Sequence, residues 1–161
     1  MEAALVTLFR HHLWANETLF AFVAGQAGEA LSARAHGGYG PVHETVHHIV
    51  ANEESYLASL KGEWPEDPLF GYAAPPAMDE LLRRARLTGD QCISFAASLE
   101  PAARITGTWR GHPYDMPASI PLLQVINHGT AHRGHNRSAL SANGFVPPEI
   151  DVWHFHGALQ G

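Results

Sequence analysis

The sequence predicts an all-α fold, a four-helix bundle with crossover connections, as a single domain over residues 1–161. Three observations predict it. Four stretches carry apolar residues at the 3.6-residue helical spacing, stop signals such as glycine and proline end them, and the segments between them are long enough to cross a bundle. Apolar residues make up 45% of the 161 residues and charged residues 16%, which is typical of a globular protein.

The first predicted helix has one apolar face and ends at Gly25, a natural helix stop. The second follows the run Gly37–Gly40, has Pro41 in its first turn and ends near Gly62. Four prolines make the segment after Gly62 a loop. The apolar face of the first helix is formed by Leu5, Leu8, Phe9, Leu19, Phe20 and Val23.

The third predicted helix runs from about Met78 to Leu99, and the fourth spans roughly Ser119 to Ala142. Between them, Thr, Ile, Trp and Tyr around Gly111 favour a short hairpin. The aromatic tail after residues 147–148 is too short to be a domain, and we expect it to cover one end of the bundle.

The charge balance narrows the range of partners. The formal net charge is −6 and no basic stripe exists, which argues against a nucleic-acid partner. Arg83, Arg84 and Arg86 cluster, but we expect them to form a solvated helix face. Cys92 is the single cysteine, which fits a reducing compartment. Because we also find neither a secretion signal nor a run of about 18 apolar residues, we expect a cytoplasmic protein with no membrane partner.

Twelve histidines are about three times the number expected for this length. His128 and His132 are four residues apart in the fourth helix, so their side chains project from one face, one turn apart. Two neighbouring imidazoles on an inward face need partners for their ring nitrogens, and a divalent metal ion can take one nitrogen from each. A solvated surface pair is the alternative that the spacing leaves open.

Two further groups of polar residues stand out. His12 and Asn16 fall in the middle of the apolar face of the first helix, so each needs a partner inside the bundle, either as a pocket wall or as a bonded core pair. In the second helix, His43-Glu44-Thr45-Val46-His47 matches the H-E-x-x-H pattern of metallopeptidases. We interpret this match as fortuitous, because it begins two residues after Pro41, in the first turn. Periodicity does not choose between His47 and His48.

Four segments carry a family resemblance that covers most of the chain. Residues 13–17 resemble the Trp-Ala-Asn motif, and residues 48–53 the His-Leu/Ile…Glu segment, of the DinB/YfiT-like metalloenzymes. Residues 127–134 resemble that family's Asn-His-x-x-His-His-Arg-Gly motif, the most specific of the signals, and residues 147–151 are similar to its closing segment. These proteins are four-helix bundles that include thiol-dependent S-transferases.

The resemblance implies the metal ligands His48, His128 and His132, and it selects His48 over His47. Ala131 replaces a frequent histidine that is not a ligand. His135 stands where glutamine is usual, on the ligand side of the helix, where it could hydrogen-bond near the metal or act as a fourth donor. With His12 and Asn16, His135 completes the residues that we expect to line the site.

Three neutral imidazoles leave a coordination position open, as in catalytic sites. Nitrogen donors suit zinc, nickel, iron or copper. Such an ion can activate water for hydrolysis or a low-molecular-weight thiol for transfer. We therefore expect a metal-dependent small-molecule transferase or hydrolase, and the resemblance implies a homodimer. The alternatives are a non-catalytic metal or small-ligand binding module and a zincin-like peptidase that uses His43 and His47.

Overall fold

The computed structural model describes residues 4–26, 28–109 and 111–161, and it is mostly helical, as predicted. The helices are α1 (Ala4–Ala24), α2 (Gly28–Ser32), α3 (Val42–Lys61), η1 (Leu69–Gly71), α4 (Met78–Ser98), α5 (Ser119–Ala142) and α6 (Val152–Ala158). Strands β1 (Arg104–Trp109) and β2 (His112–Pro117) lie between α4 and α5. Among the described residues, no helix is both long and apolar enough to cross a membrane.

The four long helices begin and end at the residues whose backbone preferences predicted them. Pro41 precedes α3 in an extended conformation, and Gly62 ends that helix at φ +77°, a left-handed conformation that glycine adopts without strain. Asn143 and Gly144 end α5, with the Asn143 amide bonded to the Leu140 carbonyl. The three short helices α2, η1 and α6 were not predicted.

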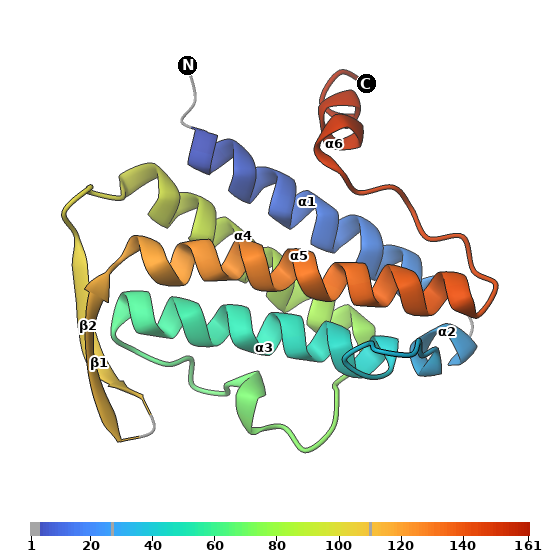
Figure 1. The fold of residues 1–161 in the computed structure, drawn as a ribbon, viewed down its shortest axis with the longest axis horizontal. Coiled ribbons are helices and arrows are strands. Elements are labelled where there is room, and N and C mark those ends of the chain that lie inside the picture. The colour runs from blue at the N-terminus through green and yellow to red at the C-terminus, as the bar shows by residue number, and fades with distance from the viewer. Residues whose placement is uncertain (1–3, 27, 110) are drawn as a thin grey trace.

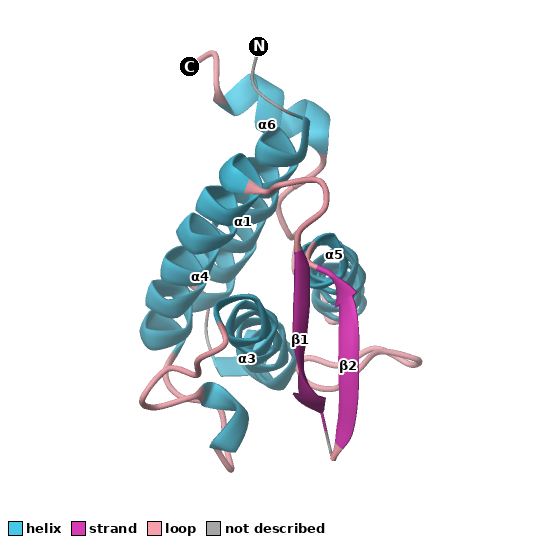
Figure 2. Cartoon of the chain, turned by 90° about the vertical axis from the view of Figure 1, so that its left-hand side faces the viewer, coloured by secondary structure: helices cyan, strands magenta, loops and turns pink. Residues whose placement is uncertain are grey.

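The long helices form two layers (Figures 1 and 2). Helix α1 packs mainly against α4, α3 packs mainly against α5, and further contacts join α3 to α4 and α1 to α5. The core between them is mostly apolar, and its largest fully buried side chains include Phe9, Phe20, Leu19 and Ile49. The α3–α5 pair matters most for function, because it carries the histidines that the sequence singles out.

The predicted hairpin is confirmed. Strands β1 and β2 pair antiparallel in a register that joins Arg104 to Pro117 and Trp109 to His112. Figure 1 shows the hairpin crossing one end of the α3–α5 pair. The hairpin therefore lies across that end of the α3–α5 pair.

The C-terminal tail differs from the expectation. Helix α6 packs against the flank of α1, where the Phe155 ring lies 5.7 Å from His11 and 5.6 Å from Trp14 between ring centroids. Asp151 caps α6 by accepting hydrogen bonds from the amides of Trp153 and His154. The tail thus covers the side of one helix, because Phe155 finds its aromatic partners in the middle of α1.

The prediction that Arg83, Arg84 and Arg86 form a solvated face is wrong for Arg84. The Arg84 side chain is only 10% exposed and pairs with Glu54 at 2.9 Å, and it also donates to the Asp67 backbone carbonyl. The partners lie 17 and 30 residues away in sequence, so helical periodicity could not reveal them. This cluster fastens the 62–77 loop to α3 and α4.

Candidate metal centre

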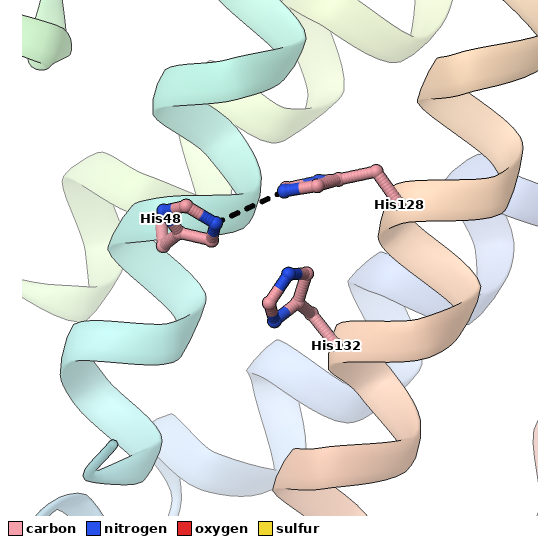
Figure 3. A group of neighbouring side chains, drawn as sticks. All are labelled: His48, His128 and His132. Atoms are coloured by element: carbon pink, nitrogen blue, oxygen red, sulfur yellow. Dashed lines mark hydrogen bonds between the residues drawn. The ribbon is translucent and has the colours of Figure 1, made fainter. Parts of the chain in front are cut away.

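Helices α3 and α5 bring together His48, His128 and His132 (Figure 3). One ring nitrogen from each residue lies within 4.8 Å of one from each of the others. Nε2 of His48 and Nε2 of His128 are 3.0 Å apart, and the ring centroids of His128 and His132 are 4.4 Å apart. Among the described residues this is the one group of three histidine, cysteine, aspartate or glutamate side chains placed closely enough to hold a metal ion.

The environment of the cluster favours the neutral form of its three imidazoles. Burial and the neighbouring imidazoles lower the pKa of His48 to about 4 and that of His128 to about 4. Burial, followed by the charge of His135, lowers the pKa of His132 as well. Neutral imidazole is the form that binds metal ions. The three rings are therefore in their ligand state at neutral pH.

An aromatic side chain covers one side of the cluster. The Tyr39 ring stacks on His48, with centroids 4.0 Å apart, and meets His132 edge to face at 5.0 Å. Tyr39 lies in the glycine-rich run 37–40, where Gly37 adopts φ +76°. This role of Tyr39 was not predicted, and its single signal in the sequence is an aromatic residue flanked by glycines.

The polar neighbours of the ligand rings are few. His135 places Nδ1 3.4 Å from Nδ1 of His132, and the Asn52 amide lies 3.2 Å from Nδ1 of His48. His135 is not part of the three-residue group, which fits a supporting contact rather than a fourth ligand. Nδ1 of His128 is buried without a hydrogen-bond partner.

The structure places His12 and Asn16 in a buried hydrogen-bond network, each only 1% exposed. Nε2 of His12 lies 2.8 Å from Glu53, and the Asn16 amide donates to the same carboxylate at 2.9 Å. Arg133 donates to the Asn16 side-chain oxygen at 2.8 Å. Arg133 directly follows the ligand candidate His132, so the network supports the core side of α5.

Gly129 shows how tightly this network packs on α5. A Cβ at this position would overlap the His12 ring and lie 3.0 Å from Nη1 of Arg133. Gly129 directly follows His128. The close approach of His12 to the α5 backbone therefore sets the position of the helix that carries two of the three histidines.

The H-E-x-x-H residues lie apart from the cluster. Nε2 of His43 bonds the Pro76 carbonyl at 2.8 Å, and Nε2 of His47 lies 3.1 Å from the Leu69 carbonyl. Both rings hold the 62–77 loop against α3. Neither ring belongs to the group of residues that could hold a metal ion among the described residues, which supports the interpretation of the match as fortuitous.

A comparison with family models matches the DinB family over residues 1–160. The chain belongs to the DinB family. Among solved structures, a DinB-like protein from Bacillus cereus ATCC 10987 is similar in fold, with a TM-score of 0.69 and 18% sequence identity over 91% of this chain and 95% of that chain. None of the curated proteins matches the chain. Membership of the DinB family agrees with the resemblance seen in the four sequence segments.

Proposed function

We propose that His48, His128 and His132 hold one divalent metal ion, and that this DinB-family chain is a metal-dependent transferase that uses a low-molecular-weight thiol on a small molecule. The observation that carries the proposal is the cluster of three neutral imidazoles, from two helices, with their nitrogens within 4.8 Å. Hydrolysis at the same site is the other reaction that this donor set supports.

The residues present fit such an ion. Two imidazole nitrogens on one tetrahedral zinc ion lie roughly 3.3 Å apart, given zinc–nitrogen bonds of about 2.0–2.1 Å. The 3.0 Å separation of the His48 and His128 nitrogens is close to that value. A ligand imidazole commonly donates from its other nitrogen to an acceptor. Nδ1 of His135 lies where it can accept from Nδ1 of His132, whereas Nδ1 of His128 has no such partner among the described residues. The all-nitrogen donor set suits zinc, nickel or iron.

The surroundings favour a catalytic site over a closed structural one. A closed site would need a fourth protein ligand, and none joins the group among the described residues. A cavity of about 410 Å³ lies beside His48 and is lined in part by Tyr39, Glu44 and Asn52. Tyr39 is 51% exposed, so a single surface side chain lies between part of the cluster and solvent.

The chemistry divides between the ion and the chain. When bound, a divalent ion with an open position acts as a Lewis acid that lowers the pKa of a coordinated thiol or water. The chain holds the three imidazoles neutral and orients His132 through His135, while Tyr39 covers His48. A small thiol is kept reduced in the cytoplasm, so the proposal places the enzyme there.

Activity profiling tests the proposal. The protein is loaded in turn with zinc, nickel or iron(II) and assayed against a panel of electrophiles, each with and without cellular thiols. We expect consumption of both thiol and electrophile, and its loss in His132→Ala. Product formation from water alone would favour the hydrolase. Metal-loaded protein that converts no substrate in either assay, with a solvent-inaccessible ion, would instead indicate a non-catalytic binding module.

A further inference from the structure

We propose that the cavity between the β1–β2 hairpin and helices α3 and α5, here called the hairpin cavity, binds a neutral and largely apolar molecule that is the organic substrate of the metal centre. The proposal rests on the proposed function and names its substrate class. The hairpin cavity measures about 450 Å³, which lies within the usual range of roughly 300–1,000 Å³ for small-molecule sites.

One face of the hairpin forms the outer wall of this cavity. The register pairs Ile105 with Met116 and Trp109 with His112, and all four residues line the hairpin cavity. Side chains alternate between the two faces of a strand. Ile105 and Met116 are accordingly half-buried, while Thr106 and Thr108 between the inward positions are exposed.

A glycine shapes the same wall. Gly107 pairs with Tyr114, and a Cβ on Gly107 would overlap the Tyr114 phenol. The Tyr114 ring therefore lies flat across the strand, in space that only glycine leaves free. An aromatic surface inside the hairpin is the consequence, and such surfaces favour flat apolar ligands.

The helices supply the inner wall. Tyr56 and Ser59 line it from α3, and Ile120 and Gln124 line it from α5. None of the described lining residues is aspartate, glutamate, lysine or arginine. By contrast, the cavity beside His48 contains Glu44, and a third cavity on the other side of α3 contains Glu54 and Lys61. A charged ligand would lose its hydration in the hairpin cavity without gaining a partner, so a neutral ligand is favoured.

The hairpin cavity lies next to the histidine cluster. Tyr56 lines the cavity, and its ring meets the His128 ring edge to face with centroids 5.8 Å apart. Gln124, at the cavity wall, precedes His128 by one helical turn on the same face of α5. Tyr56 is therefore the side chain that links the hairpin cavity to the metal ligands, and a molecule seated under the hairpin lies next to it.

Binding of a neutral fluorescent probe tests the substrate class without any metal. N-phenyl-1-naphthylamine is titrated into chelator-treated protein, and Trp109 in the wall offers an energy-transfer donor. We expect saturable binding to the wild type, weakened at least tenfold by Met116→Glu, which puts a charge on the inward face. The matched control Thr108→Glu puts the same charge on the outward face. Its affinity for the probe should stay within twofold of the wild-type affinity.

Equal binding by Met116→Glu and wild type, or no saturable binding to the wild type, would overturn the proposal. If Met116→Glu does not fold, Ser59→Phe fills the cavity from the helix side and should give the same tenfold loss.

A second measurement tests whether the hairpin cavity serves the metal centre. Cobalt(II)-loaded protein should broaden the NMR signals of the bound probe, zinc-loaded protein should not, and His132→Ala should abolish the effect. A bound probe that cobalt does not broaden would separate the cavity from the metal centre and overturn the proposal. Failure to bind cobalt would instead contradict the proposed function, while the fluorescence titration would still report the ligand class of the cavity.

Discussion

The acid–base state of the clustered imidazoles sets how metal binding should depend on pH. Proton competition for His48 and His128 begins only near their lowered pKa of about 4, and the pKa of His132 is also lowered. We expect the apparent metal affinity to be nearly constant from about pH 7 to 6 and to decline below about pH 5. The apparent affinity at each pH can be measured by competition for the metal ion with a chelator whose own affinity is known at that pH. A tenfold loss between about pH 7.5 and 6 would mean that the ligands titrate as ordinary histidines.

Two glycines of α5 give opposite expectations for the same substitution. Gly129→Ala forces a methyl group into the His12 ring, so we expect a loss of roughly 1–3 kcal/mol in the free energy of unfolding, together with weaker metal binding. Gly134 has no atom near its hypothetical Cβ, and Gly134→Ala should stabilise the helix by up to about 1 kcal/mol. Denaturant unfolding of both variants measures these changes in the free energy of unfolding. Equal stabilities of the two variants would contradict the close packing of His12 on α5.

At the scale of the elements, Arg84 anchors the long loop between α3 and α4. Arg84→Ala leaves the buried Glu54 carboxylate without its ion-pair partner and with only the Leu69 amide as a hydrogen-bond donor among the described residues, so we expect a loss of roughly 3 kcal/mol in the free energy of unfolding. The matched control is Arg83, whose side chain is 61% exposed, and Arg83→Ala should change stability by no more than about 0.5 kcal/mol. Chemical denaturation checks both, with limited proteolysis of the 62–77 loop as a second measurement. Similar losses in the two variants would remove the anchoring role.

The long elements could be predicted because their signals are local. The predicted fourth helix, Ser119 to Ala142, coincides with α5, since Asn143 and Gly144 mark its end within the sequence itself. The residues of the candidate metal centre were harder to predict from local signals. Spacing placed His128 beside His132, but only the family resemblance chose His48, which comes from another helix. The roles of Tyr39 and Arg84 were not predicted, because they depend on partners that the tertiary fold brings close.

At the scale of the whole molecule, the family resemblance predicts a homodimer. Trp153 is 83% exposed on α6, an unusual position for a large aromatic side chain, so the tail is the surface to test first. We expect light scattering at micromolar concentration to give twice the chain mass of 17.5 kDa, and Trp153→Ser to weaken the association. A monomeric mass for the wild type would contradict the prediction.

Metal content measured in purified variants tests the three-histidine site most directly. Elemental analysis of the wild type should give one divalent ion per chain, and His128→Ala or His132→Ala should lose it. His43→Ala should keep it, because the His43 ring bonds the Pro76 carbonyl and lies outside the cluster. Full metal retention in His132→Ala, or loss in His43→Ala alone, would contradict the proposal that His48, His128 and His132 form the metal centre.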